Sequence, residues 1–258
     1  MISKSELKYY SSLLQKKYRS AERKFLVEGR KSINEAILSR HLPEVIFVST
    51  AFMKESEAYL AELKSKNLII KEVTEIDFKK LSDTETPQGV SAVFKNKKEF
   101  SKSSLKEFLK SDKTLAIYLD SISDPGNLGT IIRNADWFNI SDIFMTSNCV
   151  ELYNPKVIRA TMGSIFHVNI FEHVEESFFF SEIKKEGYKI LISTLEGENI
   201  YTFDKSGKFI LCLHNEAHGV SNQLKNITEY KITIPKKGKA ESLNVASASA
   251  ILFSEFTK

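Results

Sequence analysis

The chain has 258 residues and a net charge of +4, and its hydrophobic (42%) and charged (27%) fractions are those of a globular protein with one or two domains. No apolar run approaches the roughly 20 residues that span a bilayer, and the first residues lack the apolar stretch of a secretory signal, so we expect no membrane partner. Two isolated cysteines, Cys149 and Cys212, exclude a disulfide framework and suit the reducing cytoplasm, where we expect the protein to act.

Basic residues are concentrated at the start of the chain, where residues 1–40 hold ten Lys or Arg against four Glu. The balance of 10 − 4 = +6 leaves 4 − 6 = −2 for the remaining residues. Such a segment indicates a polyanionic partner, with nucleic acid ahead of a membrane surface, although a solvated helix face has the same composition. If the partner is nucleic acid, we expect phosphate contacts from Lys16, Lys17, Arg19, Arg23, Lys24, Arg30 and Lys31.

Residues 1–95 read as a small α/β unit. Helical spacing of Leu7, Tyr10, Leu13 and Leu14 predicts an amphipathic helix on the basic segment. Apolar runs predict strands over 25–29, 43–49, 67–73 and 89–94, and helices are expected between them around 33–37, 51–66 and 75–82.

A Lys- and Ser-rich stretch interrupts this pattern, and we interpret residues 96–113 as a linker with room for one short helix. Residues 114–258 then return to longer apolar strands that alternate with helices. Near-continuous apolar strands of this kind predict a parallel sheet covered on both faces. The strands are expected over 115–120, 142–147, 165–170, 188–194, 209–214 and 230–235.

The first strand end of this second half leads into a loop that could hold phosphate. Asp124-Pro125-Gly126-Asn127 forms a turn, Gly129 opens a helix, and Arg133 follows one turn later. A helix N-terminus offers free N–H groups, and a guanidinium matches a phosphate. The stretch is neither a dinucleotide fingerprint nor a P-loop. A well-capped helix with a surface arginine accounts for it equally well.

A second loop follows the strand that ends near His214. Asn215-Glu216 comes directly after the apolar run, and Gly219 and a helix-capping Ser221 follow. A glutamate just past a buried strand is placed to face a ligand. His214 and His218 raise the possibility of a metal, but no third ligand lies nearby in the sequence, so we expect none.

The third loop follows the last predicted strand, at Ile234-Pro235. A basic turn around Gly238 leads to Ser242-Leu243-Asn244, which are ordinary helix-capping residues. The helix that follows begins with alanine and serine at every position from 246 to 250. A helix this thin allows another element or a ligand to lie very close to it.

Together, these loops resemble the three signature motifs of the SpoU family. Its members are RNA ribose 2′-O-methyltransferases of the SPOUT class, and they use S-adenosylmethionine. The resemblance rests on the turn before Gly129 with Arg133, on Asn215-Glu216 with Gly219, and on Ile234-Pro235 with Gly238 and Ser242-Leu243-Asn244. It covers the whole second domain. Residues 16–37 and 82–94 look more loosely like the substrate-binding domain attached to many members.

The resemblance implies a deep C-terminal trefoil knot, a homodimer whose subunits both contribute to the active site, and a set of donor-binding residues. The donor-binding positions it implies are Thr194, His214, Asn215, Gly219, Ile234 and Leu243. The chain departs from the family pattern at His214 and Ala217, where members usually carry glycine.

The catalytic positions implied by the resemblance are Asn127, Arg133, Glu216, Ser242 and Asn244. We expect Arg133 to grip the target phosphate and stabilise the developing alkoxide, because a guanidinium rarely gives up its proton. Ser242, Asn244 and Asn127 would orient the ribose and the donor. Glu216 would hold the loop network.

These expectations define a cytoplasmic enzyme that methylates a ribose 2′-hydroxyl of RNA. Ribosomal RNA is favoured over transfer RNA by the style of the N-terminal domain. A non-catalytic RNA-binding protein that retains the knotted fold and a generic nucleotide-binding α/β protein are the alternatives. We also expect the last helix to present a surplus apolar face for the homodimer, made by Leu243, Val245, Ile251, Leu252 and Phe253.

Overall fold

The computed structural model describes residues 2–97, 100–111, 113–215 and 219–258. The chain divides into two compact units. The first unit comprises Met1–Lys97 and Glu151–Phe166, and the second comprises Lys98–Val150 and His167–Lys258. None of the helices in the described part of the chain is long and apolar enough to cross a bilayer.

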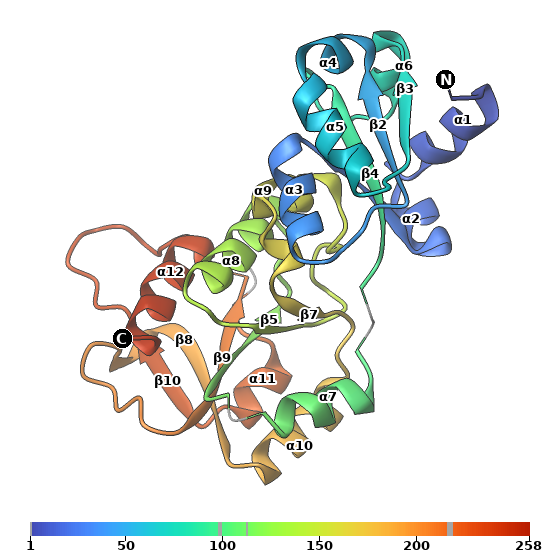
Figure 1. The fold of residues 1–258 in the computed structure, drawn as a ribbon. Helices are drawn as coiled ribbons and strands as arrows, with labels where there is room; N and C mark the ends of the chain where they lie inside the picture. Colours follow the sequence, from blue (N-terminus) through green and yellow to red (C-terminus); the bar gives the residue numbers. More distant parts are fainter. Residues whose placement is uncertain (1, 98–99, 112, 216–218) are drawn as a thin grey trace. The chain divides into compact units, whose positions relative to one another are not determined.

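The first unit is built on a four-stranded mixed sheet in the order β1-β4-β2-β3, drawn in blue to green in Figure 1. Strand β4 is antiparallel to both of its neighbours, whereas β2 and β3 are parallel. The strands are β1 (Lys24–Glu28), β2 (Val45–Ser49), β3 (Ile70–Val73) and β4 (Val90–Lys95). The helices are α1 (Lys4–Ser12), α2 (Lys16–Glu22), α3 (Arg30–Leu38), α4 (Thr50–Glu55), α5 (Glu57–Ser65), α6 (Glu75–Lys80), α9 (Pro155–Thr161) and the 3₁₀ turn η1 (Ser164–Phe166).

The segment 151–166 completes the core of the first unit, although it is distant from the rest of that unit in the sequence. The ring of Tyr153 lies 4.4 Å from the ring of Phe25 on β1. The ring of Phe166 lies 5.1 Å from that of Phe94 on β4. A buried ion pair joins Arg19 to Glu151. These contacts explain why the segment belongs to the first unit.

The second unit contains a six-stranded sheet in the order β10-β8-β9-β5-β6-β7, and every pairing in it is parallel. Its strands are β5 (Leu115–Asp120), β6 (Asp142–Met145), β7 (Asn169–Phe171), β8 (Tyr188–Asn199), β9 (Lys208–His214) and β10 (Tyr230–Thr233). Its helices are α7 (Lys102–Leu109), α8 (Pro125–Trp137), α10 (Glu176–Lys185), α11 (Asn222–Ile227) and α12 (Val245–Phe256). The prediction of a parallel α/β domain is confirmed.

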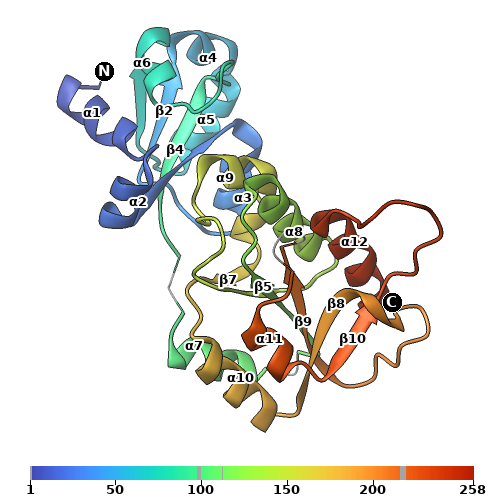
Figure 2. The ribbon, with the colours of Figure 1, turned by 180° about the vertical axis from the view of Figure 1, so that it is seen from behind.

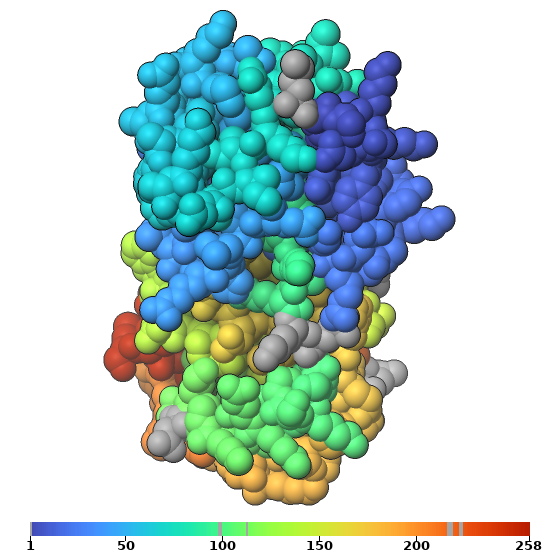
Figure 3. Space-filling model, turned by 45° about the vertical axis from the view of Figure 1, so that its right-hand side comes forward, coloured from blue at the N-terminus to red at the C-terminus, as the bar shows by residue number. Residues whose placement is uncertain are grey.

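Helices α7 and α10 lie side by side over one face of this sheet (Figures 1 and 3). Leu105 and Phe108 of α7 and Phe179 of α10 are buried in one cluster with Tyr118 and Ile190 of the sheet. Helix α7 lies within the segment that we expected to link two domains. Because Leu105 and Phe108 are buried, this helix is part of the core of the second unit and not only a connection.

Helix α12 packs against α8 and contacts β9 (Figure 2). The side chain of Asn134 on α8 donates hydrogen bonds to the carbonyl oxygen of Ala246 and to Oγ of Ser249, both at 2.9 Å. The small residues at the start of α12 therefore let α8 approach closely.

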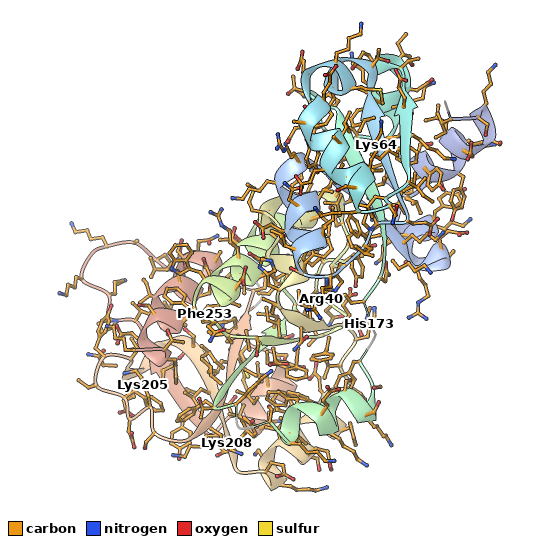
Figure 4. All side chains as sticks on the ribbon, in the orientation of Figure 1. Arg40, Lys64, His173, Lys205, Lys208 and Phe253 are labelled. Carbon is orange, nitrogen blue, oxygen red and sulfur yellow. The ribbon has the colours of Figure 1, made fainter. Side chains whose placement is uncertain are left out.

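The prediction that the last helix presents a surplus apolar face was wrong for most of the residues we named. Val245, Leu252 and Phe253, the last labelled in Figure 4, are buried within the subunit. Ile251 is half-buried. Leu243 alone of this set is exposed, at 45%. These side chains face the chain's own core because α12 packs against α8 and contacts β9.

Two other sequence predictions need correction. The expected strand over 165–170 is split: residues 164–166 form η1, and only Asn169–Phe171 form a strand. The apolar run divides because Ile165 and Phe166 are buried in the first unit, whereas Ile170 lies in the sheet of the second. The single helix expected over 51–66 is two helices that meet at Ser56, whose backbone is not helical.

Candidate active site

A cavity of about 450 Å³ lies at the carboxyl ends of strands β8, β9 and β10. Ligands usually bind at these ends in parallel α/β sheets. The walls come from the ends of the strands and from the long connection between β10 and α12. The lining residues are Ser193, Thr194, Leu195, Leu213, His214, Gly219, Thr233, Ile234, Pro235, Lys236, Lys237, Gly238, Ala240, Glu241, Ser242, Leu243, Val245 and Ala248.

One wall is fixed by an unusually close approach of β8 and β10. The register between them shifts after Lys231, and a Cβ atom built on Gly197 would lie 2.7 Å from the backbone of that lysine. The hydroxyl of Thr233 donates a hydrogen bond to the carbonyl oxygen of Leu195 at 3.1 Å. Strand β8 therefore continues to Asn199, and its residues Ser193, Thr194 and Leu195 border the cavity.

His214 ties two parts of the cavity wall together. Its Nε2 lies 3.1 Å from the carbonyl oxygen of Ser193 on β8, and its Nδ1 lies 3.1 Å from that of Asn215. The imidazole replaces the glycine usual in the resembling family, and its nitrogens face main-chain oxygen atoms. The ring therefore links β8 to the loop after β9.

An asparagine pair joins the first loop to the third. The amide nitrogen of Asn244 donates a 2.8 Å hydrogen bond to Oδ1 of Asn127. Oδ1 of Asn244 also caps α12, because it accepts from the backbone N–H groups of Ala246 and Ser247. Asp124 caps α8 in the same way, accepting from the backbone N–H of Asn127 at 2.7 Å. The starts of α8 and α12 are thus held together.

The second loop is fastened to the first by Asn215. Its amide nitrogen donates hydrogen bonds to the carbonyl oxygen of Ser121 at 3.2 Å and to Oγ of Ser123 at 2.8 Å. Beside it, Asp120 is a buried carboxylate at the end of β5, and it accepts from the hydroxyl of Ser121. The backbone N–H of Ser221, which caps α11, also points to Asp120 at 3.4 Å.

The structure brings most of the expected site residues to one place. Five of the six expected donor-binding residues line the cavity, and Asn215 lies beside it on the adjoining loop; the five are Thr194, His214, Gly219, Ile234 and Leu243. Ser242 lines the cavity as well, and Asn244 and Asn127 bond at its edge. Arg133 is exposed on α8 and is not part of the lining. Glu216 and Ala217 lie outside the described residues.

Neither cysteine is suited to act as a nucleophile. Burial raises the pKa of the Cys212 thiol well above its ordinary value, and the nearby carboxylate of Asp120 adds to the effect. Burial also raises the pKa of Cys149. Both side chains therefore stay protonated thiols, and thiolate is the reactive form.

Burial also raises the pKa of a carboxyl group on α10. Glu176, at the start of α10, has a raised pKa first because of burial and second because of the charge on Asp120. Among the described residues, no group of three or more His, Cys, Asp or Glu side chains is arranged to hold a metal ion.

Sequence reasoning missed much of the cavity wall. Leu195, Thr233 and Ala248 line it, and so do Lys236 and Lys237. The lysines directly follow a predicted strand, and residues in this place often line a ligand site, so the sequence could have indicated them. Leu195 gave none, because the extension of β8 depends on the shifted pairing with β10.

Comparison with known proteins assigns the family. The model of the SpoU rRNA Methylase family matches residues 114–254, and that of the MRM3-like substrate binding domain matches residues 4–92. The chain belongs to the SpoU rRNA methylase family. The recognition that we drew from the three loops is confirmed.

Similar proteins support the same assignment. The chain is 31% identical, over 96% of its length and 94% of the relative's, to the 23S rRNA (guanosine(2553)-2′-O)-methyltransferase RlmP of Bacillus subtilis. It is 34% identical to the human mitochondrial rRNA methyltransferase 3 over 61% of this chain, which corresponds to 37% of that longer protein.

Solved structures share the fold over nearly the whole chain. An AdoMet-bound rRNA methyltransferase from Sinorhizobium meliloti superposes with a TM-score of 0.84 at 27% identity, covering 99% of this chain and 95% of that one. The SpoU methyltransferase AviRb from Streptomyces viridochromogenes, in complex with AdoMet, has the same fold, with a TM-score of 0.83, 21% identity, and coverage of 98% and 97%. The trefoil knot concerns how the chain is threaded, and it stays a prediction.

The basic surface of this SpoU family member differs from our expectation at two positions. Arg19 is buried, and its guanidinium binds Glu151 through two nitrogens at 2.6 and 2.8 Å. Lys24 bonds Glu44 at 2.7 Å. These charges are already neutralised within the first unit. Four of the named residues are exposed, and no carboxylate of the described residues forms an ion pair with them: Lys16, Lys17, Arg30 and Lys31.

Proposed function

We propose that this protein transfers the methyl group of S-adenosylmethionine to a ribose 2′-hydroxyl of RNA, with ribosomal RNA as the substrate class. The observation that carries the proposal is that three loops from separate parts of the sequence meet at one cavity. The Asn244–Asn127 hydrogen bond and the bonds of Asn215 to Ser121 and Ser123 join these loops. The named activities of the relatives point to the same substrate class.

The cavity fits the donor. Its volume lies within the range of about 300–1,000 Å³ that small-molecule sites occupy, and Leu195, Leu213, Ile234, Leu243 and Val245 offer apolar surface for an adenine ring. We assign adenosine binding to His214, Ile234 and Leu243 at the loop junctions, with Thr194 and Gly219 closing the wall. When bound, S-adenosylmethionine supplies a methyl group that its sulfonium already activates, so no side chain has to protonate a leaving group.

The chain's own residues would then act on the RNA. Arg133 is exposed about two turns into α8, and among the described residues no carboxylate forms an ion pair with it. We assign it to the target phosphate and to the negative charge that develops on the ribose oxygen. Its guanidinium stays protonated, so it is unsuited to accept the hydroxyl proton. Ser242, Asn244 and Asn127 would orient ribose and donor, and Glu216 would hold its loop.

One experiment tests this function directly. Ribose methylation is mapped by mass spectrometry in total RNA from cells with and without the gene. We expect one or more ribose 2′-O-methyl groups in ribosomal RNA to disappear with the gene. Loss confined to transfer RNA would move the substrate to that class. If no ribose methylation is lost while the purified protein binds RNA, the chain is a non-catalytic RNA-binding protein. Calorimetry with S-adenosylmethionine gives an independent check, because such a protein need not bind the donor.

We also propose that the protein acts in the cytoplasm as a homodimer with two-fold symmetry. Trp137 on α8 is 83% exposed and Leu243 is 45% exposed, which leaves apolar surface on the second unit. Light scattering at micromolar concentration should give twice the chain mass of 29.4 kDa. A mass equal to one chain would contradict the proposal.

A further inference from the structure

The connection between β10 and α12 carries an unusual concentration of positive charge. Residues 234–244 leave the body of the second unit as an open loop (Figures 1 and 2). Lys236, Lys237 and Lys239 are all exposed, and the first two line the cavity directly. Glu241 is the acidic residue of the loop, so its net charge is 3 − 1 = +2.

These lysines differ from other exposed lysines of the second unit. Lys184, Lys185 and Lys258 each have a glutamate within 3.5 Å. By contrast, no carboxylate of the described residues forms an ion pair with Lys236, Lys237 or Lys239. The positive charge at the cavity mouth is therefore left uncompensated by the described part of the chain.

The donor does not match this charge. S-adenosylmethionine carries a sulfonium, an ammonium and a carboxylate, which sum to one positive charge. Three lysines beside a cation weaken its binding through like-charge repulsion. If the positively charged loop binds a ligand, that ligand is therefore an anion and not the donor.

The proposed reaction brings an anion to this place. A ribose within an RNA strand has a phosphate on each side, and both accompany the ribose when its hydroxyl reaches the donor. A lysine ammonium is a flexible point charge that suits phosphate oxygens in varied positions. Because these contacts involve only the backbone, they would position the strand without reading its sequence.

We propose that Lys236, Lys237 and Lys239 form a phosphate clamp, which holds the RNA backbone on either side of the target nucleotide. This inference rests on the proposed function and extends it. It gives the second unit its own RNA-binding surface, separate from the basic residues of the first unit. Donor binding does not require the clamp.

The size of the effect follows from counterion release. For single strands, the logarithm of affinity falls by about 0.7 per phosphate contact for each tenfold rise in salt. At 0.1 M salt each contact is then worth about fivefold in affinity. Loss of three contacts should weaken RNA binding about 100-fold and flatten the salt slope by about 2.

The test replaces all three lysines with glutamine in the full-length protein. The matched control replaces Lys106, Lys110 and Lys225 with glutamine, since these are exposed on α7, after α7 and on α11 of the same unit. The net charge falls by three in both proteins. RNA affinity is measured between 0.05 and about 0.3 M salt, a range in which phosphate contacts dominate. The probe is unmodified large-subunit ribosomal RNA from cells that lack the gene, and donor affinity is measured by calorimetry.

We expect the clamp variant to lose RNA affinity and salt slope, to keep donor affinity within a few-fold, and to differ clearly from the control. Equal RNA affinity and slope in the two variants would overturn the clamp. So would a loss of donor affinity with unchanged RNA binding, because the lysines would then serve the donor's carboxylate. Both readouts are independent of turnover. A wild-type protein that methylates no RNA would therefore refute the proposed function without deciding on the clamp.

Discussion

Asparagine side chains do much of the positioning around the cavity because an amide can donate and accept at the same time. Asn244 donates to Asn127 while its oxygen caps α12. Asn134 joins α8 to α12, and Asn215 joins the loop after β9 to the loop after β5. An aspartate in these places could cap a helix but could not donate the second bond.

Replacing Asn244 with alanine should affect both stability and donor binding. The variant loses the cap of α12, which typically costs about 1 kcal/mol. It also loses the bond to Asn127, so the turn that carries Leu243 is no longer fixed. We expect a lower melting temperature and a donor affinity reduced about tenfold, measured by calorimetry. Ser101→Ala removes the cap of α7 in the same unit and serves as control. It should lower stability and leave donor affinity unchanged.

Arg133 should separate chemistry from donor binding. It lies on α8, outside the lining of the cavity. Arg133→Ala should leave donor affinity within a few-fold, while methyl transfer falls by about 10²–10³, because one aligned charge is lost at a developing oxyanion. Arg133→Lys should restore little, since an ammonium lacks the planar fork. Rates are measured with saturating donor and unmodified ribosomal RNA.

A neighbouring threonine provides the control for Arg133. Thr130 is exposed on α8 less than one turn earlier, and Thr130→Ala should methylate RNA at the wild-type rate. Normal methylation by Arg133→Ala, together with a defect in Asn244→Ala, would make Arg133 merely a surface residue on a capped helix.

At the residue scale, the sequence predicted which side chains cap helices better than it predicted which charged side chains are free to bind a ligand. Ser221 and Asn244 were expected as caps, and each caps a helix. Asp124 was expected only in a turn before a helix that opens at Gly129, but it caps α8, which already begins at Pro125. Side-chain oxygens followed by a helical pattern are a local signal. Arg19, by contrast, was expected to be free for phosphate but is buried against Glu151. Its partner is 132 positions away, so no local pattern reveals it.

At the scale of elements, the wall between β8 and β10 depends on a single glycine. A Cβ atom on Gly197 would meet backbone atoms of Lys231 at 2.7 Å, and a backbone has little freedom to move away. Gly197→Ala should therefore destabilise the protein by about 1–3 kcal/mol, as overpacking does. Thermal unfolding measures the loss. Gly238→Ala is the matched control, because nothing lies within 4 Å of a Cβ atom there. An equal melting temperature for both variants would show that the strands can separate at no cost.

Strands with a simple apolar pattern were predicted well, whereas elements shared between two environments were not. β5 and β9 lie where the apolar runs placed them. The run at 165–170 had a comparable composition, yet its first residues pack in the first unit and its last ones in the sheet of the second. Periodicity reports that residues are buried but not in which core.

At the scale of the whole molecule, the division into units does not follow the order of the chain. Residues 151–166 come from the middle of the half that we read as one methyltransferase domain, but they complete the core of the first unit. Tyr153 and Phe166 pack on Phe25 and Phe94. Removing residues 1–95, which would otherwise be the natural way to isolate the methyltransferase half, would expose these rings. Point variants are therefore the better test.

Among the residues that the structure describes, the ion pairs Arg19–Glu151 and Arg159–Asp83 connect this segment to the first 97 residues, and they should differ in their contribution to stability. Arg19 and Glu151 are 4% and 13% exposed, whereas Arg159 and Asp83 are 33% and 38% exposed. Arg19→Ala leaves Glu151 nearly buried without its cation and removes a hydrogen bond to the carbonyl oxygen of Leu13. Breaking a buried pair in this way typically costs about 3–5 kcal/mol. Arg159→Ala breaks an exposed pair, which is usually worth at most about 1 kcal/mol.

Urea unfolding of the two variants should therefore show a large loss of unfolding free energy for Arg19→Ala and almost none for Arg159→Ala. The double variant Arg19→Met with Glu151→Leu should recover much of the loss, because it replaces the pair with apolar side chains and leaves no unpaired charge. Similar small losses for both single variants would mean that segment 151–166 contributes little to the first unit. That result would restore the simpler division of the chain into two consecutive domains.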